Sequence, residues 1–306
     1  MPDGVLLMAY GTPATLADLE PYYTHIRRGR PPEPAQLAEL RARYEAIGGC
    51  SPLLEITRAQ ARGLEQELQA RTGKPVPVEL GMKHSPPFIE DGVQALYAAD
   101  IRQVTGLVLA PHYSALSVGE YRDRALAAAE QLDLSFIEQW HLAPKYIEFL
   151  ASGVRACLDD FPAQTRDQID VVFTAHSLPE RIVQAGDPYP QQLRETAEAV
   201  AQRAGVKRWS TGWQSAGRTS EKWLGPDIVQ VVGELAGAGS RGLIVCPAGF
   251  VSDHLEILYD LDIECSQVAA AAGLPFKRTD SPNTDPMFLS ALADVVLQRE
   301  QLTAAG

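Results

Sequence analysis

Short apolar runs alternate with amphipathic stretches along the whole 306-residue chain, and this alternation restricts the fold most strongly. The runs at 5–10 and 106–111 lie in the first half, and those at 170–175 and 242–247 lie in the second. Between them, stretches such as 56–72 carry apolar residues three to four positions apart, a spacing typical of helices. Strands that alternate with helices predict parallel sheets. We therefore expect an α/β protein.

The two halves of the sequence also resemble each other. AYGTP at 9–13 aligns with AHSLP at 175–179, and GLVLAP aligns with GLIVCP. This register places Glu120 opposite Glu256. The match indicates an internal duplication of a Rossmann-like lobe. The alternative is chance, because many α/β lobes share an apolar strand followed by proline.

A duplication predicts two lobes with parallel sheets around a central cleft. We expect the first lobe over 1–143 and the second over 144–285. Tyr10 and His176 would then occupy equivalent strand ends, where one chemical group from each lobe can flank a flat ligand.

The net charge of the chain limits its partners, and the length of its N-terminal apolar run limits its compartment. The net charge of −12 and the pI near 5.0 argue against nucleic acid or an anionic membrane surface as the main partner. The N-terminal apolar run of six residues is too short for a signal peptide or a membrane span. We expect a cytoplasmic protein without stable membrane insertion.

The cysteines show no pattern of a disulfide frame or a zinc site. They stand at Cys50, Cys157, Cys246 and Cys265, with no CxxC pair. Dispersed thiols are typical of a reducing compartment.

Two local patterns imitate functional motifs. The stretch 237–242 matches GxGxxG, but it precedes a strand, whereas a dinucleotide fingerprint follows one. The stretch 212–217 misses the nucleophile elbow by one residue. Nucleotide binding and serine hydrolysis are therefore rejected.

Imidazole and carboxylate groups follow two of the predicted strands. His176 ends one run, and Glu256, Asp260 and Glu264 follow another at four-residue intervals, which would form one ridge on a helix. An imidazole that is largely neutral at pH 7, together with a carboxylate, can hold a divalent metal ion and accept protons. Asp260 and Glu264 would relay protons or bind a second cation such as Mg²⁺. The alternatives are a turn-shaping histidine and a solvated acidic helix face.

Three further histidines are expected to be structural. His254 should point to a different face from Glu256. His84 and His112 follow apolar strands, where a histidine either lines the cleft or bonds to the strand end.

The segment 25–44 is basic within this acidic chain. Five arginines against two glutamates give it a local charge of +3. Guanidinium groups pair well with carboxylates, which indicates an anionic ligand. The alternative is that these arginines pair with nearby glutamates, and we expect Arg28, Arg30 and Arg41 to do so.

Longer motifs occur in order from about residue 5 to about residue 295. They include VLLMAYGTP, YYTHIRRGRPP, RYEAIGGCSPL, APHYSALSVGEY, HSLPE, TGWQSAG, WLGP and GFVSDHLE. In sequence and spacing, this series resembles the ferrochelatases. The resemblance is strongest to the compact type that inserts ferrous iron into coproporphyrin III.

The resemblance implies a chelatase-type fold, a reaction and a set of site residues. His176 and Glu256 would be the catalytic and metal-binding pair, and Tyr10 the axial ligand to the product iron. Contacts to the macrocycle would come from Tyr10, Arg27, Arg43, Tyr44, Ser51 and Tyr121. The last helix, about 286–306, would pack back on the first lobe.

The implied substrates are Fe²⁺ and coproporphyrin III, and two protons are released. The C-terminal sequence LQREQLTAAG contains no cysteine, so we expect no iron–sulfur cluster and no cofactor apart from a secondary Mg²⁺. We expect a monomer that meets other haem-pathway enzymes transiently. The alternatives are the same reaction on protoporphyrin IX and a non-catalytic porphyrin carrier.

Overall fold

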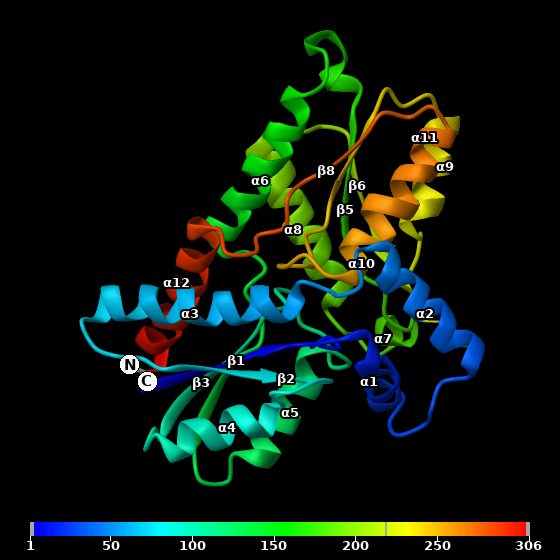
Figure 1. Ribbon diagram of the computed structural model, residues 1–306. Coiled ribbons are helices and arrows are strands. Elements are labelled where there is room, and N and C mark those ends of the chain that lie inside the picture. The colour runs from blue at the N-terminus through cyan, green and yellow to red at the C-terminus, as the bar shows by residue number, and fades with distance from the viewer. Residues whose placement is uncertain (1–2, 218, 304–306) are drawn as a thin grey trace.

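The computed structural model describes residues 3–217 and 219–303 and contains two parallel four-stranded sheets (Figure 1). The first sheet has the order β2-β1-β3-β4, and the second has the order β6-β5-β7-β8. Their strands are β1 (Gly4–Ala9), β2 (Val78–Met82), β3 (Gln103–Val108), β4 (Asp133–Ile137), β5 (Asp170–His176), β6 (Trp209–Gln214), β7 (Leu243–Cys246) and β8 (Phe276–Arg278). The predicted α/β class with two Rossmann-like lobes is confirmed.

The two sheets share one topology. In each, the first strand of the lobe pairs with the second on one side and with the third on the other. All six residues of β1 are buried, as expected for a parallel strand covered on both faces. Because β1 and β5 are equivalent, Tyr10 after β1 and His176 at the end of β5 lie at matching strand ends.

The helices surround the sheets. Their bounds are α1 (Leu19–Ile26), α2 (Pro34–Ala46), α3 (Leu53–Thr72), α4 (Ile89–Ala98), α5 (Val118–Ala128), α6 (Pro144–Asp159), α7 (Arg181–Gln184), α8 (Tyr189–Ala204), α9 (Ile228–Gly237), α10 (Leu255–Leu258), α11 (Ser266–Ala271) and α12 (Pro286–Thr303). Two 3₁₀ turns, η1 (Leu16–Asp18) and η2 (Ala163–Gln168), and a π-helix, η3 (Asp260–Cys265), complete the elements.

Helices α3 and α12 join the lobes. Figure 1 shows α3 running between the two sheets, and α12 packs against both α3 and α6. The packing is close, because a Cβ atom at Gly63 of α3 would lie 2.5 Å from Leu289 of α12. One apolar cluster includes residues of both sheets and of these helices. Residues 304–306 of the predicted last helix lie outside the described part of the chain.

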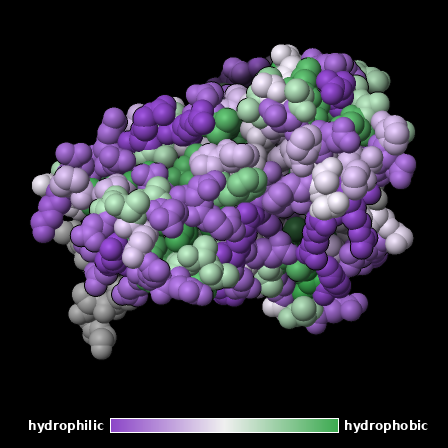
Figure 2. Space-filling view, turned by 60° about the horizontal axis from the view of Figure 1, so that its bottom comes forward, coloured by the Kyte–Doolittle hydropathy of each residue, from purple (hydrophilic) through white to green (hydrophobic). Residues whose placement is uncertain are grey.

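Hydrophobic residues do not gather into one large area on the face drawn in Figure 2, where they form small separate groups among hydrophilic ones. Within residues 3–217 and 219–303, no helix is long and apolar enough to cross a membrane.

Candidate functional site

A cleft of about 530 Å³ lies where the carboxyl ends of the two sheets face each other. Residues that follow β1 and β3 form one wall, and residues that follow β5 and β7 form the other. Open parallel sheets bind ligands at this edge. Of the predicted site residues, six line the cleft: Tyr10, Tyr44, Ser51, Tyr121, His176 and Glu256.

The structure brings His176 and Glu256 together. Nε2 of His176 lies 3.6 Å from Oε1 of Glu256. The other ring nitrogen, Nδ1, lies 2.5 Å from the carbonyl oxygen of Ser177, so Nδ1 carries the proton that it donates there. This contact orients Nε2 toward the carboxylate and leaves Nε2 as the atom that can exchange a proton or bind a metal.

The two groups change each other's protonation. Burial lowers the pKa of His176, but the Glu256 charge, the hydrogen bonds to Glu256 and Ser177 and the Asp260 charge together outweigh burial and raise this pKa above its usual value. Burial raises the pKa of Glu256, and the adjacent imidazole reverses this effect and holds it at about 2. The free protein therefore contains more protonated His176 than an isolated imidazole would show at neutral pH.

The loop between β7 and α10 places Glu256. Its Gly249 lies so close to β5 that a Cβ atom there would be 2.5 Å from the Cβ of Ala175, and the Gly249 N–H donates to the carbonyl of Thr174. His254 caps α10, since its Nδ1 accepts a hydrogen bond from the Ile257 N–H at 3.2 Å. His254 has this structural role and also lines the cleft.

The acidic residues do not form the expected α-helical ridge. The α-helix α10 ends at Leu258, and the π-helix η3 follows from Asp260, so the backbone period changes between Glu256 and Glu264. Asp260 is buried and accepts a 2.5 Å hydrogen bond from Ser215, whereas Glu264 is exposed. Burial, reinforced by the Glu256 charge, raises the pKa of Asp260 to about 7. Neither Asp260 nor Glu264 lines the cleft.

The first lobe supplies hydroxyl groups to its wall. Tyr10 is 43% exposed in the cleft, and its ring lies 4.6 Å from that of His84. Tyr44 is buried, with its hydroxyl 3.2 Å from the hydroxyl of Thr12. Ser51 Oγ accepts a hydrogen bond from the Leu53 N–H at the start of α3.

Arg27 and Arg43 do not line the cleft. Arg27 Nε donates to the carbonyl of Arg30 at 3.3 Å. Arg43 lies 3.5 Å from Asp260 and 4.9 Å from the ring centre of Tyr259, both at the start of the π-helix region.

Arg28 also lines the cleft, and it pairs with a glutamate as expected, with its side chain 89% exposed. It has a positive φ of 56° and lies 3.6 Å from Glu120, which also binds Lys83 at 2.5 Å. Lys83 packs 5.1 Å from the ring centre of Tyr121. The position of Lys83 directly after β2 was the signal that sequence reasoning did not use.

Other lining residues were missed as well. Tyr189 begins α8 and donates from its hydroxyl to the carbonyl of His176 at 2.9 Å, while Trp223 lies in the WLGP motif. His84 and His112 line the cleft, and each also contacts a distant residue, His25 and Thr196 respectively. Within the described residues, no three His, Cys, Asp or Glu side chains meet as a metal-binding group. A divalent ion would thus find two protein ligands at His176 and Glu256.

Comparison with solved structures identifies the fold. SirB from Bacillus subtilis with Fe³⁺ superimposes with a TM-score of 0.56 at 14% identity, covering 97% of this chain and 95% of that chain. CbiX, described as the terminal enzyme for biosynthesis of sirohaem in denitrifying bacteria, gives a TM-score of 0.54 at 12% identity. It covers 96% of this chain and 98% of its own. At these identities the likeness concerns the fold.

Comparison of sequences is more specific. Coproporphyrin III ferrochelatase from Geobacillus thermodenitrificans is 48% identical over 304 residues, covering 97% of this chain and 95% of that protein. The protein of the same name from Bacillus subtilis is 44% identical over 301 residues, with 97% of each chain covered. Residues 2–300 match the family profile described as Ferrochelatase. The chain belongs to the ferrochelatase family.

Proposed function

We propose that this protein inserts ferrous iron into coproporphyrin III during haem biosynthesis and releases two protons. The observation that carries the proposal is the pairing of His176 with Glu256 in a cleft whose opposite wall presents Tyr10. The named relatives, which align over nearly their full length, support the reaction and its substrate.

The chemistry requires a proton acceptor next to a metal ligand. We propose that Glu256 meets the incoming Fe²⁺ together with Nε2 of His176. The Glu256 charge favours the protonated imidazole, and a cation bound to Glu256 would cancel this effect. Arrival of the metal would thereby lower the pKa of His176, so that its proton passes to solvent and Nε2 is left free to bind the ion. Nε2 would accept a pyrrole proton only after the ion has moved onto the macrocycle.

The choice of porphyrin follows from charge. Coproporphyrin III carries four propionates, whereas protoporphyrin IX carries two. Arg28 and Lys83 line the cleft and can pair with propionates once Glu120 gives way. Family resemblance adds Arg27 and Arg43, whose side chains would have to leave their present partners.

The test is anaerobic Fe²⁺ insertion followed by absorbance with both porphyrins. We expect kcat/KM for coproporphyrin III to exceed that for protoporphyrin IX by at least about tenfold, since one desolvated charge-assisted bond contributes roughly 1.5–3 kcal/mol. Equal values for both substrates would reject the four-propionate argument, and a preference for protoporphyrin IX would support the other substrate.

His176→Ala separates the enzyme from a non-catalytic porphyrin carrier. Loss of a positioned general base costs about 10²–10⁴-fold in turnover. We expect insertion to fall in this range while fluorescence quenching shows unchanged porphyrin binding. A variant that keeps more than about a third of wild-type turnover would remove His176 from the mechanism.

Three subsidiary proposals concern cations, assembly and compartment. Asp260 and Glu264 are proposed to relay protons or to bind a second cation such as Mg²⁺. A monomer is proposed to suffice, because residues of a single chain form both walls of the cleft. Free thiols at all four cysteines support a reducing compartment such as the cytoplasm.

A further inference from the structure

A buried glutamine connects the first lobe to the loop that carries Glu256. Gln60 of α3 is fully buried, and its Nε2 lies 3.0 Å from the carbonyl of Val251, 2.9 Å from the hydroxyl of Ser252 and 2.8 Å from the carbonyl of Asn283. Its Oε1 accepts a hydrogen bond from Ser252 at 3.2 Å. The side-chain amide thus uses both of its polar ends.

Asn283 holds the same loop from the other side. Its backbone N–H donates to the Val251 carbonyl at 3.0 Å, its Oδ1 accepts from the Asp253 N–H at 2.8 Å, and its Nδ2 donates to Asp253 Oδ2 at 2.8 Å. The φ of Asn283 is +45°, a left-handed conformation that asparagine tolerates better than most residues. This conformation lets backbone and side chain contact the loop together.

The loop has a demanding task. Val251 and Ser252 are buried and form part of the cleft wall, and Glu256 follows four residues after Ser252 at the start of a helix of only four residues. A helix that short does not fix its own direction. The position of Glu256 therefore depends on how firmly residues 251–254 are held.

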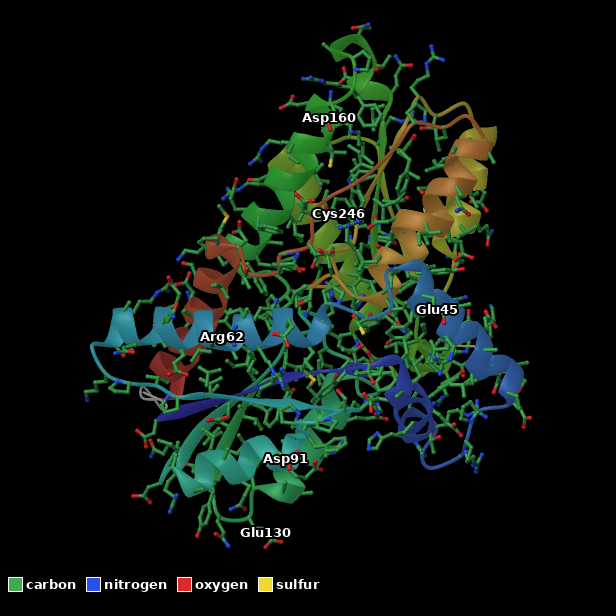
Figure 3. The ribbon with its side chains drawn as sticks, in the orientation of Figure 1. Glu45, Arg62, Asp91, Glu130, Asp160 and Cys246 are labelled. Carbon is green, nitrogen blue, oxygen red and sulfur yellow. The ribbon has the colours of Figure 1, made fainter. Side chains whose placement is uncertain are left out.

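We propose that Gln60 and Asn283 are positioning residues that keep the Glu256 carboxylate within reach of His176. Figure 3 labels Arg62, two residues after Gln60, and shows its helix crossing beside the second lobe. Gln60 thereby ties the wall of the first lobe to a carboxylate of the second. The inference rests on the proposed function, because it assigns that carboxylate to iron and proton transfer.

The test is Gln60→Met, which keeps the volume and removes the hydrogen bonds. The matched control is Gln192→Met. Gln192 is also a buried glutamine that connects the lobes, with Oε1 accepting from the Tyr113 N–H at 2.7 Å and Nε2 donating to Gln139, and these side-chain hydrogen bonds go to residues outside 251–256. Misplacement of a catalytic group by about 1 Å costs on the order of 10²-fold.

We expect Gln60→Met to lower kcat for iron insertion by about 10- to 100-fold with the porphyrin KM changed less than about twofold. Gln192→Met should keep kcat within about twofold, both variants being assayed below their unfolding temperatures. Asn283→Ala should repeat the result of Gln60→Met, and it carries the test if Gln60→Met does not fold. Equal losses of kcat in the Gln60 and Gln192 variants would overturn the proposal.

Hydrogen exchange makes the inference independent of turnover. In Gln60→Met, amides of residues 251–258 should exchange at least about tenfold faster than in the wild-type protein, and in Gln192→Met they should not. If the wild-type protein inserts no iron, the proposed function fails, whereas unchanged exchange in Gln60→Met overturns the positioning role.

Discussion

At the scale of single residues, a Tyr10 variant tests whether the matching strand ends of the two lobes face the same ligand. Family resemblance implies that the Tyr10 oxygen is a ligand of the product iron. Burial in the cleft raises the pKa of Tyr10 above its usual value, and the charge of Glu256 raises it further. Free Tyr10 is therefore neutral at pH 7. We expect Tyr10→Phe to shift the absorption spectrum of bound ferric product and to alter product release more than iron insertion.

The competing view treats Tyr10 as a packing residue with a role in stability alone. On that view, Tyr10→Phe would lower the thermal unfolding temperature and leave the product spectrum unchanged. The partial exposure of Tyr10 and its position on the cleft wall favour the first outcome. An unchanged spectrum would also remove the match between the strand ends of Tyr10 and His176 as support for the site.

The sequence could predict residues that follow strands directly. Tyr10, His176 and the approach to Glu256 were found because apolar runs end beside them, and parallel strands end at one edge. Gln60 could not be found in this way. Its partners Val251 and Ser252 are 191 and 192 positions away, and only the packing of α3 across the lobes brings them into contact.

At the scale of elements, the π-helix creates a coupling between Arg43 and Asp260. Arg43 of α2 lies 3.5 Å from the buried Asp260, and this charge counters the effects of burial and Glu256 on the pKa of the carboxyl, which is about 7. Asp260 is thus mainly neutral at pH 6 and mainly charged at pH 8. We expect the Arg43–Asp260 coupling free energy to be larger at pH 8 than at pH 6.

A double-mutant cycle with Arg43→Ala and Asp260→Asn measures this coupling by urea unfolding at both pH values. Removal of Arg43 leaves a buried charge without its partner and should cost about 1–3 kcal/mol at pH 8. The contacts of Arg43 with Glu39 and Tyr259 are present in both the wild-type and the Asp260→Asn backgrounds, so their contributions cancel in the coupling free energy. A coupling that is zero at both pH values would make the contact incidental.

The π-helix itself was beyond sequence reasoning. Acids at four-residue spacing indicate one face of an α-helix, and no residue type in DLDIEC distinguishes a π-helix from an α-helix. The helix predicted from apolar periodicity over 56–72 is confirmed as α3. The three-residue strand β8 was missed, because FKR carries too few apolar residues to be recognised.

At the scale of the whole molecule, a buried histidine between the lobes should make stability depend on pH. His112 follows β3, is 1% exposed, and bonds through Nε2 to the hydroxyl of Thr196 on α8 at 2.9 Å. Its ring lies 5.7 Å from that of His141 and 6.1 Å from that of Tyr189. Burial lowers the pKa of His112, and the neighbouring His141 adds a smaller effect in the same direction, so that this pKa is about 3.

The unfolded chain should therefore bind one more proton than the native protein between about pH 6.5 and pH 3, because an exposed histidine has a pKa near 6.5. The free energy of unfolding then falls by up to about 1.4 kcal/mol per pH unit as the pH drops from about 6.5 to about 3. Above about pH 6.5, His112 makes no contribution to the pH dependence of stability. We expect His112→Gln to be less stable at pH 7 but to show a shallower decline between pH 6 and pH 4, measured by urea unfolding. Thr196→Val should lower stability and keep the decline, since His112 still titrates. An unaltered decline in His112→Gln would mean that groups other than His112 cause the loss of stability in acid.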